Sequence, residues 1–333
     1  AGFRRLPKNF VRDVIMKAPS KDIMNNLTRS VLTLASYDRE YTDISMSNVL
    51  KQCLKLISMF PMLTAYGYHA YNHYKRDKSF YIHRPKAELS TAENMLRMLR
   101  PDKKYTELEA KVLDIALVLH MEHGGGNNST FTTHVITSAG SDTYSVVAAA
   151  LSSLKGPKHG GANLAVIGMM KDIMSNVKDI TDFKEVEEYL KKILAGKAND
   201  GSGLIYGLGH AVYTVSDPRA ILLKKMAKQL AIEENLLDEF MLYDFIEKRA
   251  PVLFMEAKGT EKPMPANVDL YSGFVYNALN IPIDIATPLF ATARLSGWCA
   301  HRIEEIVAGG KIMRPAYKCI MPKCTYIPID KRN

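Results

Sequence analysis

The sequence predicts an all-α protein. Apolar residues recur three or four positions apart, which is helical spacing, in nearly every periodic segment of the 333-residue chain. Two capping boxes, Ser90 with Glu93 and Thr106 with Glu109, mark helix starts directly ahead of apolar runs. No two segments show the clean alternation expected of paired strands. The length and the 47% apolar content are those of a globular protein with a large core.

The N-terminal part of the chain is expected to place several helices around one buried helix. Ser20 can cap a helix over residues 24–34, where apolar residues recur at helical spacing. Residues 46–73 form a longer apolar segment, in which Pro61 is expected to break the helix because proline cannot donate a backbone hydrogen bond. Residues 108–120 are apolar nearly all round, which predicts a buried central helix.

A glycine run ends this helix and a segment of mixed preference follows. Gly124, Gly125 and Gly126 are a helix stop signal, and they leave His123 at the mouth of the core. A lone histidine at a helix end more often caps carbonyl groups. Residues 130–137 are rich in β-branched types and would favour a strand. We set that preference aside because no partner strand is found.

Residues 156–163 (Gly-Pro-Lys-His-Gly-Gly-Ala-Asn) form the turn around which the rest of the chain is organised. Pro157 fixes the approach of the chain, and Gly160 and Gly161 let a ligand or another backbone come close. An unperturbed histidine titrates at about 6.5, so His159 can donate or accept a proton at physiological pH. The alternative is a helix-to-helix turn with an incidental histidine.

A second glycine-rich loop, residues 201–209, ends at His210. It neither follows a strand nor has P-loop spacing, which excludes dinucleotide and Walker-type sites. Asp217 is the expected N-cap of the next helix and Pro218 its first residue. Arg219 then lies in the first turn, where backbone N–H groups favour an anion. A surface arginine is the alternative.

The C-terminal third carries one acid and two arginines of interest. Asp269 lies in a mild stretch, residues 267–273, and buried acids are rare unless they are paired or functional. A solvated loop aspartate is the alternative. The last predicted helix, residues 289–307, carries Arg294 near its start, and Arg314 follows in a basic tail.

Composition excludes several classes of protein. The four cysteines are scattered, which fits a reducing cytoplasm, and Cys319 and Cys324 lack the neighbours of a zinc site. The net charge is +9 without a long Lys/Arg run, which favours polyanionic small molecules over nucleic acid. No apolar run approaches the roughly 20 residues of a membrane span. Residues 1–8 are polar and basic, unlike a secretory signal.

Taken together, six segments resemble the citrate synthase family in order and spacing over most of the chain. They are His123–Asn127, Gly156–Asn163, Gly209–Tyr213, Asp217–Arg219, Asn267–Gly273 and Arg294–Trp298. The resemblance implies a large helical domain (1–158 and 280–333), a small one (159–279) and an active site between them. It also implies a homodimer, and the scattered cysteines place it in the cytoplasm.

The implied activity is the tricarboxylic acid cycle condensation of acetyl-CoA with oxaloacetate to citrate and CoA. By resemblance the catalytic residues are His159, His210 and Asp269. The oxaloacetate-binding residues are His123, Asn127, Arg219, Arg294 and, across the dimer, Arg314. The segment facing CoA is Leu204, Ile205, Tyr206, Gly207, Leu208 and Gly209. CoA is a co-substrate, and no tightly bound cofactor, metal, nucleic acid or membrane is expected.

The chemistry requires these residue types. A thioester methyl group is a very weak acid, so Asp269 can remove its proton only if the enolate oxygen is stabilised at once, which is the task of His159. His210 would polarise and protonate the keto oxygen of oxaloacetate. Arginines match carboxylates as bidentate forks.

The sequence departs from the family pattern at its start and leaves two alternatives open. Members usually carry a further N-terminal stretch before the segment that matches residues 6–24. Ala211 stands where many members have arginine, and Thr214 where some have a basic residue. The alternatives are a 2-methylcitrate synthase that uses propionyl-CoA, since one methylene changes a pocket's affinity only modestly, and a non-catalytic helical protein that binds CoA.

Overall fold

The computed structural model describes residues 3–209, 213–259 and 264–332, and within these ranges the regular structure is helical. The one departure there is an isolated antiparallel bridge between Leu208 and Ala266. The all-α prediction is confirmed.

The long helices follow one another along the whole chain. In order they are α1 (Ile23–Ala35), α2 (Met46–Arg76), α3 (Thr91–Leu99), α4 (Glu107–His120), α5 (Asn128–Ser138), α6 (Thr143–Leu154), α7 (Ala162–Asn176), α8 (Phe183–Leu194), α9 (Pro218–Glu233), α10 (Leu237–Lys258), α11 (Val268–Ala278) and α12 (Ala286–Ala308). Short helical turns are η1 (Val11–Ile15), η2 (Ile283–Ile285) and η3 (Ile329–Lys331). Among the described helices, none combines the length and apolar character needed to cross a bilayer.

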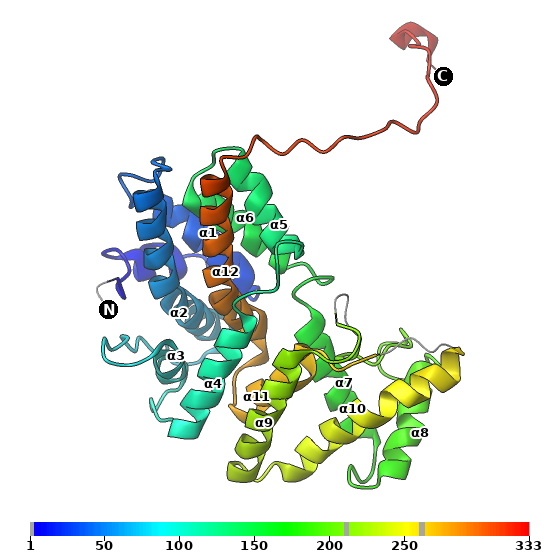
Figure 1. Ribbon diagram of the computed structural model, residues 1–333. Helices are drawn as coiled ribbons and strands as arrows, with labels where there is room; N and C mark the ends of the chain where they lie inside the picture. Colours follow the sequence, from blue (N-terminus) through cyan, green and yellow to red (C-terminus); the bar gives the residue numbers. More distant parts are fainter. Residues whose placement is uncertain (1–2, 210–212, 260–263, 333) are drawn as a thin grey trace.

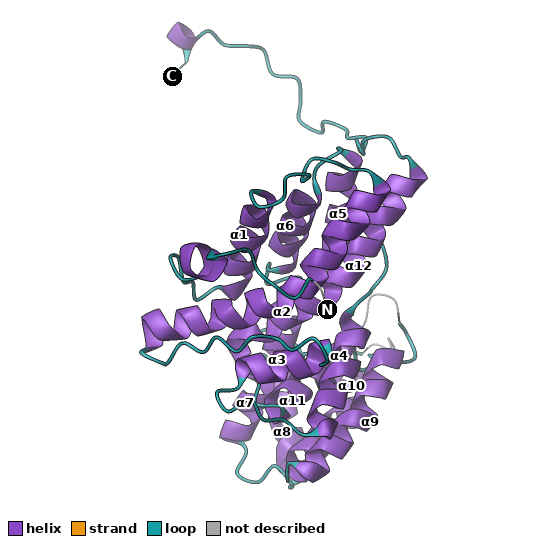
Figure 2. Cartoon of the chain, turned by 90° about the vertical axis from the view of Figure 1, so that its left-hand side faces the viewer, coloured by secondary structure: helices purple, strands orange, loops and turns teal. Residues whose placement is uncertain are grey.

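These helices form two groups with α4 between them (Figure 1). Helices α1, α2, α5, α6 and α12 pack on one another, and α7 to α11 gather in the second group, a separation also visible in Figure 2. Helix α4 contacts α3 and α12 on one side and α9 and α11 on the other. It is therefore central, but Val118 is 54% exposed, so the expectation of burial all round was wrong. The proposed domain limits remain a prediction.

Local capping chemistry starts several helices where the sequence places them. Both predicted capping boxes are present, with each N-cap hydroxyl accepting from the N3 backbone and each N3 glutamate accepting from the N-cap backbone. Helix α1 is capped by Asp22 instead of Ser20, because the Asp22 carboxylate accepts from the backbone N–H of Asn25. The Ser20 hydroxyl accepts from the backbone N–H of Asp22, two residues too early to be the cap.

The expected break at Pro61 is wrong, because α2 continues through it. Proline removes one backbone hydrogen bond, but Phe60, Met62 and Leu63 beside it are all buried. The Thr64 hydroxyl also lies 3.1 Å from that of Thr292 on α12. Tertiary packing on both flanks of the proline offsets the missing hydrogen bond.

Residues 130–137 are helical, within α5, despite their β-branched composition. The helix packs against α6 and α12, and packing of this kind overrides weak local propensity. The hydroxyl of Thr133 donates back to the carbonyl of Ser129 at 3.0 Å, which satisfies a buried polar group inside the helix. Setting the strand preference aside was correct.

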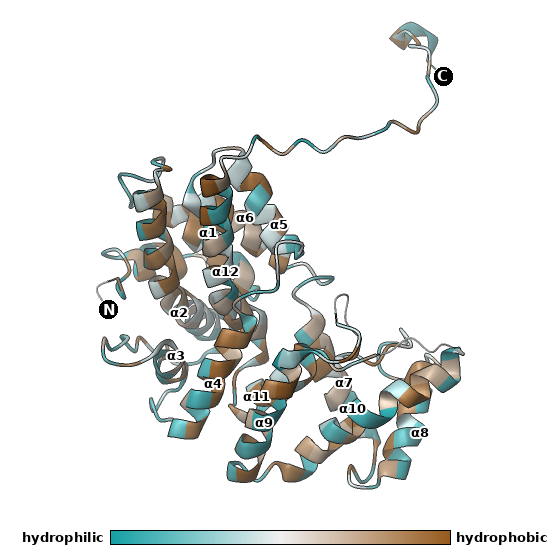
Figure 3. Cartoon of the chain, in the orientation of Figure 1, coloured by the Kyte–Doolittle hydropathy of each residue, from teal (hydrophilic) through white to brown (hydrophobic). Residues whose placement is uncertain are grey.

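The last residues leave the body of the protein as an extended tail (Figures 1 and 2). Figure 3 shows apolar residues spaced along this tail. Tyr317 and Ile320 are at least 90% exposed, and Ile329 is 80% exposed.

Candidate active site

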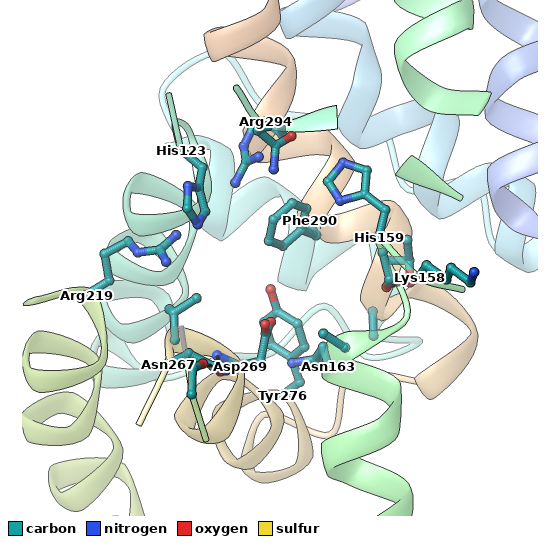
Figure 4. A pocket seen from close by; sticks show the side chains of 17 residues that line it. His123, Lys158, His159, Asn163, Arg219, Asn267, Asp269, Tyr276, Phe290 and Arg294 are labelled. Atoms are coloured by element: carbon teal, nitrogen blue, oxygen red, sulfur yellow. Dashed lines mark hydrogen bonds between the residues drawn. The ribbon is translucent and has the colours of Figure 1, made fainter. Parts of the chain in front are cut away.

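A cavity of about 410 Å³ lies where the two groups of helices meet. Seven predicted site residues line it, Gly209 of the expected CoA segment and six others, and they come from segments far apart in the sequence (Figure 4). The six are His123, Asn127, His159, Arg219, Asp269 and Arg294; further lining residues include Lys158, Asn163, Asn267, Tyr276, Thr287 and Phe290. The cavity thus combines two arginines, two histidines and a carboxylate.

Asp269 stands in the first turn of α11, where its position is set by a cap. The side chain of Asn267 accepts from the Asp269 backbone N–H and donates to the carbonyl of Gly209, both at 3.0 Å. Two further backbone hydrogen bonds join residues 265–267 to the glycine-rich loop. The N–H of Gly209 donates to the carbonyl of Pro265, and the N–H of Asn267 donates to the carbonyl of Gly207. The loop at residues 204–209 is therefore fixed directly beside the start of α11.

The Asp269 carboxyl group is suited to exchange a proton near neutral pH. Burial raises its pKa to about 6, and the charge of Arg219 opposes that rise. A base with a pKa close to the working pH combines a large ionised fraction with useful proton affinity. The side chain can therefore act as a general base in the cavity.

His159 is held at the cavity wall by a tight turn. A Cβ atom on Gly160 would lie 2.2 Å from the carbonyl oxygen of Leu154, so only glycine fits after this histidine. The ring Nε2 accepts from the backbone N–H of Ser129 at 3.3 Å and lies 2.9 Å from the Ser129 hydroxyl oxygen, which accepts from the indole N–H of Trp298 at 3.1 Å. Burial, together with Arg294, lowers the His159 pKa. The ring is thus neutral with its proton on Nδ1, as a hydrogen-bond donor.

Arg294 is a buried cation that lacks the partners such a group requires. It is 0% exposed, and its Nε donates to the carbonyl of His120 at 2.8 Å. Nη1 and Nη2 find no acceptor among the described residues. The guanidinium lies 4.6 Å from the ring centre of Phe290, and burial lowers its pKa to about 10. Buried donors are nearly always satisfied, so this end of the cavity is built for an anion.

Arg219 lies on the same side of the cavity as Arg294, with His123 between them (Figure 4). The predicted cap and first residue of α9, Asp217 and Pro218, are both confirmed. Asp217 has a fully buried carboxylate that binds Arg219 through Nε at 3.0 Å and Nη2 at 2.8 Å. It also accepts from the backbone N–H of Val268 at 3.1 Å. One carboxylate therefore aims the arginine and joins the starts of α9 and α11.

Two residues that sequence reasoning passed over lie at the same site, Tyr276 in the cavity wall and His120 behind it, against Phe290 and Arg294. His120 is fully buried beside Phe290, and neither ring nitrogen has a partner among the described residues. Burial, then Arg294, lowers its pKa to about 3, so the ring is neutral. Tyr276 lines the cavity, and its buried hydroxyl likewise lacks a partner in that part of the chain. Their positions in the sequence could have pointed to the site, because His120 lies three residues before His123 and Tyr276 lies seven residues after Asp269.

Of the remaining predicted residues, those that the structure describes do not line this cavity. His210 lies outside the described residues. Arg314 is exposed at the start of the tail, away from the lining. Of residues 204–209 only Gly209 lines the cavity, while Ile205 is buried and Leu204 is 49% exposed.

Comparison with known proteins gives one consistent result. The family model described as citrate synthase, C-terminal domain, matches residues 1–316. A citrate synthase from Synechocystis sp. is 40% identical over 249 residues, which cover 74% of this chain and 58% of that protein. A citrate/2-methylcitrate synthase from Bacillus subtilis is 35% identical over 319 residues, which cover 96% and 78%.

A solved structure gives the same result for the fold. Citrate synthase from Thermoplasma acidophilum was solved as a ternary complex with carboxymethyl coenzyme A and oxaloacetate. Its structure matches this chain with a TM-score of 0.80 and 27% identity, and the match covers 99% of this chain and 81% of that chain. The matched part of this chain spans 58% of the Synechocystis protein and 78% of the Bacillus one. The family match, the fold and the cavity agree, and the chain belongs to the citrate synthase family.

Proposed function

We propose that this protein condenses acetyl-CoA with oxaloacetate and hydrolyses the resulting thioester to citrate and CoA. The observation that carries the proposal is the pairing of Arg294, buried with two unpartnered Nη groups, with a carboxyl group of pKa about 6 in the same cavity. Arg294 can bind an anion, and Asp269, in the same cavity, can take a proton from a weak carbon acid. Membership in the family supports the same reaction.

Oxaloacetate is the ligand that the arginines fit. Its two carboxylates would accept from Arg294 and Arg219, which line the cavity on either side of His123 (Figure 4). His123 and Asn127 line the same end and supply further polar contacts. The Thermoplasma citrate synthase of similar fold was solved with oxaloacetate bound. Bringing a dianion to Arg294 also removes the cost of a buried charge without a counterion.

The proton transfer follows from the states of Asp269 and His159. The Asp269 carboxylate takes a proton from the acetyl methyl group, and the electron pair of the C–H bond moves to the thioester oxygen as an enolate forms. The Nδ1–H of His159 donates to that oxygen and stabilises the developing charge. The enolate carbon attacks the keto carbon of oxaloacetate, and His210 protonates the keto oxygen. Water then cleaves the citryl thioester and releases CoA as the thiol.

The loop at residues 204–209 is the proposed contact for the adenine of CoA. Its hydrogen bonds to residues 265–267 join it to the turn that carries Asp269. A nucleotide bound to the loop would therefore influence the position of the Asp269 side chain, which performs the first step. CoA acts here as a co-substrate that leaves with the products.

The working unit is a homodimer to which Arg314 contributes across the interface. The tail that begins near Arg314 carries exposed apolar side chains, including Tyr317, Ile320 and Ile329. Apolar side chains exposed in this way are suited to a partner surface, and a second copy of the chain offers one. The protein would work in the cytoplasm.

A second candidate is the condensation of propionyl-CoA to 2-methylcitrate. The Bacillus subtilis relative named citrate/2-methylcitrate synthase, at 35% identity, favours it. The extra methyl group needs only a small apolar space beside the reacting carbon, and a hydrophobic pocket discriminates one methylene by about 1–3 kcal/mol. Both reactions use the same base and the same arginines.

The test is release of the CoA thiol, followed with a thiol reagent. Acetyl-CoA with oxaloacetate is expected to release thiol at a rate that saturates in both substrates, while acetyl-CoA alone releases none. Repeating the assay with propionyl-CoA separates the two candidates through the ratio of kcat/KM. Binding of CoA without any thiol release, in a dimer containing the whole chain, would make the protein a non-catalytic binder and overturn the proposal.

A further inference from the structure

Outside the cavity, two histidines from different helices lie side by side where α5 packs against α12. Nε2 of His134, on α5, lies 3.0 Å from Nδ1 of His301, on α12. The same His301 nitrogen lies 3.1 Å from a carboxylate oxygen of Glu304, one turn further along α12. The backbone of Gly125 covers the pair, since a Cβ there would lie 3.8–3.9 Å from the two rings. These residues have no place in the proposed reaction.

The outer nitrogens of both rings are occupied by carboxylates. Nδ1 of His134 pairs with Glu305 at 2.8 Å, and Nε2 of His301 pairs with Glu122 at 3.0 Å. A carboxylate accepts, so each outer nitrogen carries a proton. In neutral rings the two inner nitrogens then face one another with lone pairs, across 3.0 Å. Such an arrangement is stable only when a cation, a proton or a metal ion, lies between them.

We propose that His134, His301 and Glu304 form a binding site for a divalent transition-metal ion of the Zn²⁺ class. Their ligand atoms all lie within 4.8 Å of one another. Zinc–nitrogen bonds of about 2.0–2.1 Å in a tetrahedron place neighbouring ligand atoms about 3.3 Å apart. The two separations that involve Nδ1 of His301, 3.0 and 3.1 Å, are close to that edge. The third pair, His134 and Glu304, lies within 4.8 Å, and rotation of the exposed Glu304 side chain can bring it to the ion.

The surroundings match the chosen metal class. Two imidazoles with one carboxylate suit zinc, cobalt or nickel, whereas calcium and magnesium require oxygen ligands. Metal-binding histidines usually donate their second N–H to a carboxylate, as His134 does to Glu305 and His301 to Glu122. The Glu304 side chain is 68% exposed, which leaves an access path and a position for water as the fourth ligand.

Metal binding would join three segments of the chain. Glu122, which orients His301, also accepts from the backbone N–H of His123 at 2.8 Å and from that of Gly124. A Cβ on Gly297 would lie 2.3 Å from the carbonyl oxygen of Met121, so α12 approaches this loop as closely as a backbone can. The ion would therefore hold α5, α12 and the loop after α4 together, and binding should raise the Tm.

Cobalt is the probe, because Co²⁺ at a tetrahedral nitrogen and oxygen site gives a strong visible absorption band that Zn²⁺ then displaces. The exposed tail cysteines are competing ligands, so the reference chain and every variant carry Cys319→Ser and Cys324→Ser. The full chain is stripped with a chelator and titrated with Co²⁺. We expect one equivalent per chain, displaced by Zn²⁺ and retained in excess Mg²⁺.

Four variants locate the ion. Glu304→Gln removes an exposed ligand without disturbing the core, and His134→Asn removes a ring; each should weaken Co²⁺ binding at least tenfold. Glu305→Gln, which removes an outer partner, should weaken it by about 10–100-fold. His73→Asn, at an exposed histidine bonded to the Lys78 carbonyl, is the matched control and should change nothing.

Zn²⁺ should raise the Tm of the reference chain and of His73→Asn, but not that of Glu304→Gln at the same concentration. The absence of a saturable cobalt band in the reference chain would overturn the site and leave the two rings bridged by a proton. A band that Glu304→Gln and His134→Asn leave unweakened would place the ion elsewhere and overturn it equally.

Discussion

Helix α12 carries two buried arginines, Arg294 and Arg302, whose guanidinium groups differ in their hydrogen-bond acceptors. Arg302, 1% exposed, donates Nη1 to the hydroxyl of Thr137 at 3.2 Å and Nη2 to the carbonyl of Ser141 at 2.9 Å. Arg294, 0% exposed and about two turns earlier, has no acceptor for either Nη group among the described residues. One arginine joins helices, and the other faces a cavity.

The difference shows how a buried arginine that binds a ligand can be distinguished from one that only stabilises the fold. Both side chains have the same charge and almost the same exposure, and burial lowers the pKa of each. What separates them is whether the protein supplies acceptors for the two Nη groups, since Nε of Arg302 also lacks a partner among the described residues. A buried cation whose donors point into a void is tolerated where a ligand completes it. Four predictions follow from this contrast, beginning with the base that stands opposite Arg294.

The largest effect is expected for Asp269→Asn. The amide keeps the shape of the side chain but cannot take a proton, so kcat for oxaloacetate-dependent thiol release should fall by about 10³-fold or more. Oxaloacetate binding should persist, because the arginines are untouched. A variant that turns over at a rate within tenfold of wild type would remove Asp269 from the role of base.

The two arginines should differ in what they contribute to stability. Arg302→Met leaves Thr137 and Ser141 without a donor and should lower the free energy of unfolding by about 1–3 kcal/mol. Arg294→Met removes a charge that the ligand-free protein leaves unpaired, so it should be neutral or stabilising. Chemical denaturation without ligand measures both. Equal destabilisation by the two substitutions would contradict the contrast.

The raised pKa of Asp269 should be visible in both activity and stability. The base must be ionised, so kcat/KM should rise with pH and level off above about pH 6. The folded-state pKa lies above the unfolded one, so the protonated folded form is favoured. Stability is therefore highest below about pH 4 for this group and is lost as pH rises to about 6, on the order of 2–3 kcal/mol.

Unfolding of wild type and Asp269→Asn across this range isolates the contribution of the carboxyl group. The variant should become the more stable of the two as pH rises from about 4 to 6. If the difference between their free energies of unfolding stays constant over that range, the raised pKa is ruled out.

The smallest effect is expected for Tyr276→Phe. Its buried hydroxyl has no partner among the described residues, so removing it should stabilise the ligand-free protein by about 1 kcal/mol. A hydroxyl that faces the cavity can bond a substrate, so KM should rise several-fold with little change in kcat. An unchanged KM for both substrates would show that the group does not contact either.

The sequence predicted the helix starts better than the helix interiors. Capping boxes at Ser90 and Thr106 and the Asp217 cap depend on contacts within one turn, and all three are present. Pro61 and residues 130–137 were harder to interpret, because packing against distant helices outweighs local preference there. Tertiary contacts of this kind leave little trace in a local window.

The site was predictable as far as its conspicuous segments reached. Turns rich in glycine or proline singled out His123, His159 and Arg219, and Asp269 and Arg294 stood out as charged residues in apolar segments. The resemblance added Asn127 and the roles of all six. His120 and Tyr276 were missed because each belongs to an apolar helix, His120 as its last residue, where a polar ring is easily taken for core. Likewise, His134 and His301 are 167 positions apart, so only the fold brings them together.

Direct binding of oxaloacetate tests the central claim most closely, since the cavity is held to be a dianion receptor completed by its ligand. Calorimetric titration of wild type, Arg294→Met and Arg302→Met compares the two ends of α12 in one experiment. We predict that Arg302→Met binds as wild type does, while Arg294→Met loses affinity by at least about 30-fold, a loss of about 2 kcal/mol or more. Equal affinity in all three proteins would contradict the account.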